Sequence, residues 1–137
     1  MLHLNNTHYV SMFFIMIISS LLTTMNIWAD KLDDIRFSIN DIYLAFLMTG
    51  WMFLFMGLTY KENNIIILGT LLVVINIWCI RTQFLVSERQ FKLGMIPHHS
   101  MAIHMSKKLL EKNNNIQPLL KDIIKNQEDE IVFMKSN

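Results

Sequence analysis

Three stretches without a charged side chain most constrain what this chain can fold into. No Asp, Glu, Lys or Arg occurs in residues 1–29, 42–60 or 63–80, although charged residues make up 17% of the whole chain. An α-helix needs about 20 apolar residues to cross roughly 30 Å of hydrocarbon. Within a bilayer the backbone must satisfy its own hydrogen bonds, which favours helices. The sequence therefore predicts three transmembrane helices, at about residues 9–28, 42–60 and 64–80.

The first of these segments also needs to be distinguished from a signal peptide. No basic residue precedes it, and no small-residue cleavage pattern follows it, so we expect a retained helix. The sequence constrains less strongly which side of the membrane the C-terminus occupies. A single lysine, Lys61, lies between the second and third segments, whereas Lys31, Arg36, Arg81 and Arg89 lie at the opposite ends. The excess of Lys and Arg favours a cytoplasmic location for the C-terminus.

The remainder of the chain, from residue 84, predicts a helical hairpin. Ser87 to Gln90 fits a capping box, so a helix is expected to begin near Glu88. Pro97 predicts either a kink or a fresh helix start. After a turn, Pro118 suits the beginning of a second helix. Its apolar seam consists of Leu120, Ile124, Gln127, Ile131 and Met134. We therefore predict an all-α protein with a transmembrane region at 1–83 and a hairpin domain at 84–137.

Two amphipathic helices bury too little apolar surface to be stable alone. The predicted hairpin therefore needs a partner, which the membrane helices or a second hairpin from another copy could supply. Pairing two hairpins would give a four-helix bundle, so we expect a homo-oligomer, a dimer of hairpins, in a lipid bilayer. The net charge of +1 argues against nucleic acid as a partner. Cys79 is the one cysteine, which excludes an intrachain disulfide.

The segment GMIPHHSMAIHM, residues 94–105, carries the clearest chemical signal. It places three histidines and three methionines within one predicted helix. Imidazole and thioether ligands favour soft metals, Cu(I) in particular. Neighbouring residues on a helix point about 100° apart, so one face cannot collect all six side chains. The residues allow a ligand set with Met95, either His98 or His99, and Met101, completed by Met134 or Glu130 of the second helix.

Other interpretations of these residues remain open. The histidines could be ordinary helix interior, or they could join Gln127 and Glu130 in a polar network that fixes helix pairing. The strong metal signatures HExxH, CxxC and the di-iron Glu-x-x-His spacing are missing. Neither a nucleophile–base pair nor a glycine-rich phosphate loop can be identified, so we do not expect an enzyme. A redox or transport function would need other residues, namely Met48, Met52, Met56 and Cys79, for which packing is the simpler explanation.

Two sequence segments together resemble the signature of the domain of unknown function 305 family. The first is the run Met95-Ile-Pro-His-His, and the second is a spaced pattern in the last helix. The second pattern consists of Ile123, Ile124, Gln127, Glu130, Ile131 and Met134. The order of three spans, an acidic loop after the first and a polar hairpin last is similar to that of small membrane members of this family.

This resemblance implies a ferritin-like helical bundle, with copper bound through His and Met in some members. It assigns metal binding to Met95, His98 and His99, and more loosely to Met101, Met105 and Met134. It also implies a hairpin outside the cytoplasm, against the charge count, and we adopt that expectation. The leading hypothesis is thus a membrane protein that binds copper for metal handling or tolerance. The alternative is a structural or interaction protein whose His/Gln/Glu network fixes helix pairing and oligomerisation.

Overall fold

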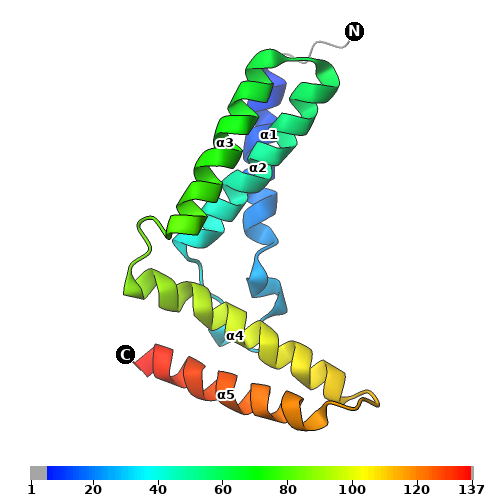
Figure 1. Cartoon of the computed structure of the whole chain (residues 1–137), viewed down its shortest axis with the longest axis vertical. Helices are drawn as coiled ribbons and strands as arrows, with labels where there is room; N and C mark the ends of the chain where they lie inside the picture. Colours follow the sequence, from blue (N-terminus) through cyan, green and yellow to red (C-terminus); the bar gives the residue numbers. More distant parts are fainter. Residues whose placement is uncertain (1–5, 137) are drawn as a thin grey trace. The chain divides into compact units, whose positions relative to one another are not determined.

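The computed structural model of this chain describes residues 6–136, and within that range all regular secondary structure is helical. Five α-helices follow one another: α1 (Asn6–Leu22), α2 (Ile39–Tyr60), α3 (Asn63–Thr82), α4 (Glu88–Leu110) and α5 (Gln117–Ser136) (Figure 1). Two short 3₁₀ helices, η1 (Met25–Trp28) and η2 (Leu32–Asp34), lie between α1 and α2. The predicted all-α fold is confirmed. A ferritin-like half-bundle and its dimerisation stay predictions.

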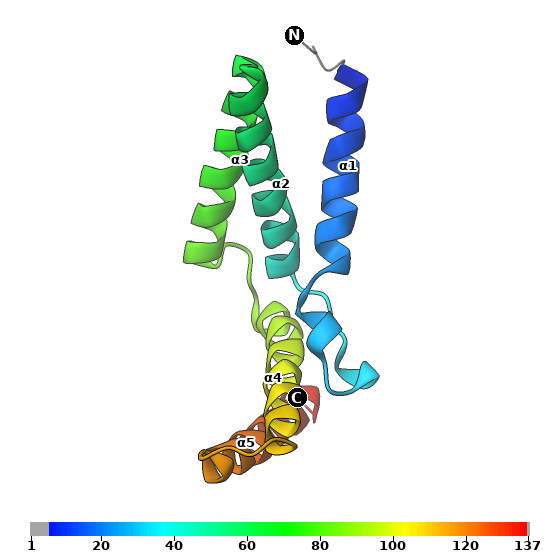
Figure 2. The same ribbon diagram turned by 90° about the vertical axis from the view of Figure 1, so that its right-hand side faces the viewer.

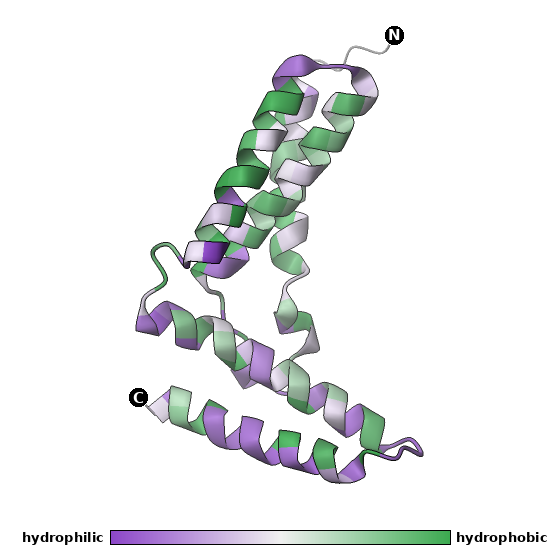
Figure 3. Ribbon diagram, in the orientation of Figure 1, coloured by the Kyte–Doolittle hydropathy of each residue, from purple (hydrophilic) through white to green (hydrophobic). Residues whose placement is uncertain are grey.

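Within residues 6–136, three helical segments are long and apolar enough to cross a membrane. They are Thr7–Trp28, Ile39–Tyr60 and Asn63–Thr82, and they contain most of the hydrophobic residues visible in Figure 3. The prediction of three spans is confirmed in length and composition, with ends within a few residues of those expected. In the first span, however, the α-helix ends at Leu22 and the chain continues as η1.

Glycines allow α2 and α3 to approach closely. A Cβ atom added to Gly69 would lie 2.4 Å from the backbone nitrogen of Leu54, and one added to Gly57 would lie 2.7 Å from that of Ile66. Gly50 faces the same neighbour, with Leu72 Cβ at 2.9 Å from its added atom. Small residues at helix interfaces let backbones pack within van der Waals distance, which drives helix association in lipid. The two helices therefore pack backbone to backbone.

Aromatic side chains connect α1 to α2. The ring of Phe13 lies 6.0 Å from that of Phe46 and 6.2 Å from that of Phe53, measured between centroids, and Tyr9 meets Phe53 edge to face at 6.5 Å. In Figure 2 α1 runs alongside α2 as a separate rod. Aromatic contacts of this kind add modestly to the area that they bury. Met48 is half exposed, in agreement with packing as the role of the methionines in α2.

Helices α4 and α5 form the predicted hairpin and lie side by side in Figure 1. The amide of Gln90 donates to the Ser87 hydroxyl at 3.3 Å, which confirms the N-terminal cap of α4. Ile96 and Ile103 of α4 pack against Ile131 of α5, with Ile124 and Met134 beside them. The predicted seam of α5 is thus the face that meets α4.

Of the two outcomes expected at Pro97, a kink or a fresh helix start, the fresh start is wrong and the kink stays a prediction. Residues 88–110 form one α-helix that contains Pro97. Proline costs a helix one hydrogen bond and crowds the carbonyl four residues earlier, here that of Leu93. Burial of Ile96 and Pro97 itself, together with that of Ile103 nearly two turns later, stabilises the helix on both sides of this defect. Tertiary packing has therefore overridden the local signal.

The chain divides into two compact units. This division differs from the expected single boundary between residues 83 and 84, because each unit contains two separate segments of the chain. The first unit contains Met1–Thr23 and Ile39–Leu85, and the second contains Thr24–Ser38 and Val86–Asn137. The predicted domains at 1–83 and 84–137 stay a prediction. The segment 24–38, which the sequence placed with the membrane region, belongs with the hairpin because η1 and η2 pack against α4.

Candidate functional site

A pocket between α4 and α5 collects part of the predicted ligand set. Met95 and His99 of α4 and Glu130 and Met134 of α5 all line it. Each pair is four residues apart, so its two members lie on the same face of their helix, one turn apart. Phe91 is a further lining residue, and its ring is half exposed. The pocket is about 560 Å³ in volume and consists mainly of apolar surface.

His99 is the most buried polar side chain in this pocket. It is 9% exposed, and its Nδ1 lies 2.9 Å from Oε2 of Glu130. Burial lowers the pKa of His99 below its ordinary value, because desolvation outweighs the attraction of the Glu130 carboxylate. His98 adds a smaller lowering of the same pKa. The imidazole is therefore neutral at pH 7, which is the form that can bind a metal.

His98 lies differently, although it is adjacent in sequence. Its side chain is exposed, and its ring centroid is 6.1 Å from that of His99 with the planes inclined at 61°. The separation follows from the helix, which turns neighbouring side chains about 100° apart. Of the two histidines that the sequence left as alternatives, His99 is the one that lies in the pocket with Met95.

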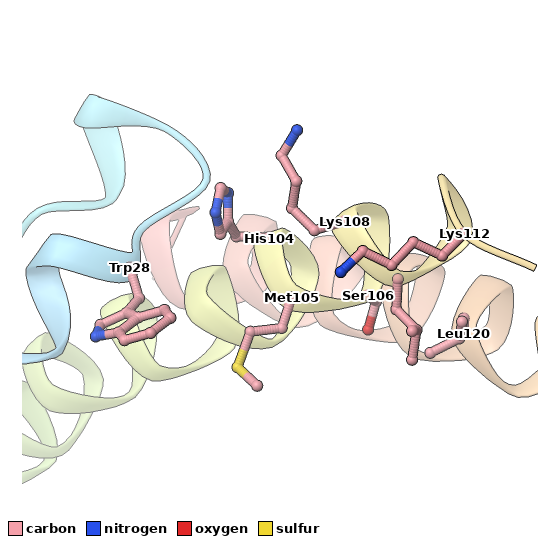
Figure 4. A pocket seen from close by; sticks show the side chains of 8 residues that line it. Trp28, His104, Met105, Ser106, Lys108, Lys112 and Leu120 are labelled. Carbon is pink, nitrogen blue, oxygen red and sulfur yellow. The ribbon is translucent and has the colours of Figure 1, made fainter. Parts of the chain in front are cut away.

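Met101 and Met105 are not among the residues that line this pocket. Met105 is 52% exposed and lines a second pocket, together with Trp28 and His104. Figure 4 shows His104 and Met105 leaving α4 in different directions, so this pocket does not bring the imidazole and the thioether together. Met101 is partly buried. The six predicted ligands are therefore divided between more than one face of α4.

The donor atoms of the pocket fit a soft metal better than a hard one. Within residues 6–136 there is no group of three or more His, Cys, Asp and Glu side chains placed to hold a metal ion. The pocket offers instead two thioethers and one neutral imidazole, and of its three carboxylates, Glu88, Asp129 and Glu130, that of Glu130 lies beside the imidazole. Thioethers bind Cu(I) and give little to Mg²⁺ or Ca²⁺. The residues present thus fit copper by the chemistry of their donor set.

A second polar cluster, which the sequence did not predict, holds the segment 24–38 on the hairpin. Asp34 is 2% exposed, accepts a hydrogen bond from Ser100 Oγ at 2.6 Å and lies 2.7 Å from Lys135 Nζ. Lys135 also pairs with Asp33. Burial lowers the pKa of Lys135, but its hydrogen bonds to Asp33 and Asp34 outweigh that effect and raise it. Lys135 is therefore a fixed positive charge.

An additional ion pair anchors the same segment further along α4. Lys107 Nζ lies 2.7 Å from Asp30 Oδ2 and 3.6 Å from Glu128 Oε1. The hydrogen bond to Asp30 raises the pKa of Lys107. The backbone amide of Asp30 in turn donates to Ser100 Oγ at 2.9 Å. The sequence signal for this docking was the group of acids at 30–34 between two uncharged spans, whose partners lie far away in the chain.

Comparisons with known proteins agree with these features. The sequence profile of the family described as Domain of unknown function (DUF305) matches residues 81–137. An uncharacterized protein of Acanthamoeba polyphaga mimivirus is 39% identical over 143 residues, a match that covers 97% of this chain and 92% of that protein. No solved structure matches the chain significantly. The first match covers the hairpin and the second extends over the three apolar helices, and on this basis the chain belongs to the DUF305 family.

Proposed function

We propose that this multi-pass membrane protein binds a soft metal, copper as Cu(I), in its C-terminal hairpin and serves metal handling or tolerance. The observation that carries the proposal is the meeting of Met95, His99 and Met134 in one pocket formed by two helices. Two thioethers and one neutral imidazole form a ligand set that Cu(I) prefers over harder ions. Binding here is capture by these side chains, without catalysis.

Glu130 would act through His99 in this proposal. Its Oε2 lies 2.9 Å from Nδ1 of His99, so the negative charge favours the tautomer with the proton on Nδ1, which leaves Nε2 with a free lone pair. A carboxylate that orients a ligating imidazole in this way is common beside protein-bound metals and raises the basicity of the ligand. Glu130 is therefore a positioning residue, and Met95, His99 and Met134 are the ligands.

The test is a Cu(I) competition titration on the full-length protein in detergent. We expect Met95→Leu/Met134→Leu to weaken Cu(I) binding at least tenfold, whereas Met101→Leu/Met105→Leu, the matched control on α4, leaves it unchanged. The leucines keep the size and apolar character of the replaced side chains. Absence of Cu(I) capture by the unaltered protein with its helix content intact, or equal losses in the two variants, would refute the proposal.

One specific observation favours a second candidate, a structural or interaction role. The contact between His99 and Glu130 joins α4 to α5 without any metal, and a polar contact made by a buried side chain can fix how two helices register. This role predicts that Glu130→Gln lowers the melting temperature, while Met95→Leu/Met134→Leu does not. The copper role predicts losses of affinity in both variants. The effect of replacing the two methionines therefore distinguishes the two candidate functions.

We also propose that the hairpin pairs with a second copy of itself. Phe91 and Phe133, which line the metal pocket, are 52% and 66% exposed, and Val132 beside them is 66% exposed. A second hairpin covering these side chains would bury them and close the pocket to water, as in a four-helix bundle. Phe133→Glu is expected to convert a dimer to a monomer by light scattering in detergent. A monomeric unaltered protein would contradict this proposal.

A further inference from the structure

Four basic side chains line another pocket of the second compact unit, at the beginning of α4. Arg36 comes from the segment 24–38, Arg89 and Lys92 from the first turns of α4, and Lys135 from the end of α5. Glu88 is the one acidic residue that lines this pocket. The volume is about 730 Å³, enough for a small polar ligand. This pocket shares Glu88, Lys92 and Met134 with the pocket that contains Met95 and His99, and its other lining residues are different.

The two lysines of this pocket are already paired, whereas the two arginines are not. Lys92 pairs with Glu88, and Lys135 pairs with Asp33 and Asp34. The Arg36 guanidinium donates to the carbonyl oxygen of Ile35 at 2.7 Å, and its charge also acts on the Asp33 carboxylate as a minor cause of that group's lowered pKa. Arg89 is exposed, and within residues 6–136 its side chain has neither a hydrogen bond nor an ion pair. Arg89 is therefore left without an anion in that range, and Arg36 has only a minor electrostatic interaction with Asp33.

The chemistry of these groups selects a phosphate. The guanidinium is a planar fork that binds phosphate oxygens in pairs, and it is weakly hydrated, so it keeps this ability at a surface. Ser87 and Glu88 place the first turn of α4 in the same pocket, and the N–H groups of a first turn beyond that of Gln90, which Ser87 caps, also favour an anion. The two arginines and the N-terminus of α4 thus both favour the same kind of ligand, a phosphate.

Chain connectivity then indicates where such a phosphate comes from. Arg36 stands just before Ile39, the first residue of the second span, so it can be at most about 10 Å from that residue along an extended chain. Arg89 follows shortly after Thr82, the last residue of the third span. Residues tethered this closely to the ends of transmembrane helices remain within reach of lipid headgroups. Basic pockets beside such helix ends are known to bind anionic lipids.

We propose that Arg36 and Arg89 bind the phosphate headgroup of an anionic phospholipid. In this role the second compact unit is held at the bilayer surface by a lipid as well as by its three chain connections to the first unit. The inference is independent of copper binding, since neither arginine belongs to the proposed ligand set.

Native mass spectrometry of the full-length protein in neutral detergent tests this proposal. The probes are phosphatidic acid, phosphatidylcholine and inorganic phosphate, each added to the unaltered protein and to Arg36→Gln/Arg89→Gln. We expect the unaltered protein to retain phosphatidic acid and not phosphatidylcholine, and the double variant to retain it at least fivefold less. The matched control, Lys121→Gln/Lys125→Gln, removes the same charge from exposed positions of α5 and is expected to retain the lipid fully.

Each other outcome overturns the assignment. Equal loss in the control would show attraction by net charge alone, without a site. Displacement of the lipid by millimolar inorganic phosphate would make this a site for free phosphate. Arg36→Lys/Arg89→Lys guards against a folding defect, because it keeps both charges and loses only the fork: it should bind between the unaltered protein and the glutamine variant, with unchanged helix content. Full loss in this lysine variant together with loss of helix content would attribute the effect to folding and refute the proposal.

Discussion

The two compact units are held together by different physical means. In the first unit, which contains the three apolar helices, α2 and α3 meet at glycines. Their backbones lie so close together that any larger residue at these positions would overlap with the facing helix. In the hairpin unit, a small cluster of isoleucines is surrounded by ion pairs that join segments far apart in the chain. Lipid offers little hydrophobic driving force between helices, so close packing must supply it. In water the hydrophobic effect drives helices together, and ion pairs can then determine which segments pair with one another.

The sharpest test of this difference is the same substitution in both units. Gly69→Ala would place a Cβ 2.4 Å from the Leu54 nitrogen, an overlap that the backbone can relieve only by separating α2 from α3. We expect a loss of more than about 3 kcal/mol in stability. In Gly94→Ala the added atom meets the Ser38 hydroxyl at 3.2 Å, and alanine is the better helix former, so the change should be within about 1 kcal/mol.

Thermal unfolding in detergent, followed by circular dichroism, measures both glycine variants. Similar melting temperatures for Gly69→Ala and Gly94→Ala would contradict the distinction between backbone packing in one unit and side-chain packing in the other.

The next largest effect is expected at the buried carboxylate of the hairpin unit. Asp34→Asn removes the charge that faces Lys135 and weakens the hydrogen bond from Ser100, at a cost of about 2–3 kcal/mol. The matched variant, Asp33→Asn, acts on a side chain that is 80% exposed, and we expect little change. Limited proteolysis within residues 24–38 is the readout. Cleavage that is equally fast in the two variants would contradict the anchoring role of Asp34.

The smallest effect concerns pH and His99. Burial lowers the pKa of His99 in the folded protein, so the unfolded chain takes up a proton first as the pH falls. The stability that neutral His99 contributes is thus complete above its ordinary pKa of 6.5 and is lost as the pH falls towards the depressed value. Glu130 opposes this shift, which keeps the loss small. His99→Gln should flatten the stability profile between pH 7 and 5, whereas the exposed His98→Gln should leave it unchanged.

The sequence predicted the helices more completely than the site. Uncharged length alone located three spans, and the Ser87 cap and apolar spacing located the hairpin, because these signals are local. The site required contacts across the chain. Met95 and Met134 were both expected as ligands, but only the packing of α4 on α5 selected His99 over His98. The helix does not restart at Pro97, because burial on either side of it outweighs its local cost.

What the sequence by itself determined is therefore the set of elements: helix number, approximate ends and the apolar face of each helix. These follow from residue type and periodicity over a few turns. The tertiary structure decided which distant residues meet, namely Asp34 with Ser100 and Lys135, Asp30 with Lys107, and Arg36 with Arg89 in one pocket. The physical reason is that an ion pair or a pocket depends on how segments from opposite ends of the chain pack, and no local pattern encodes that distance.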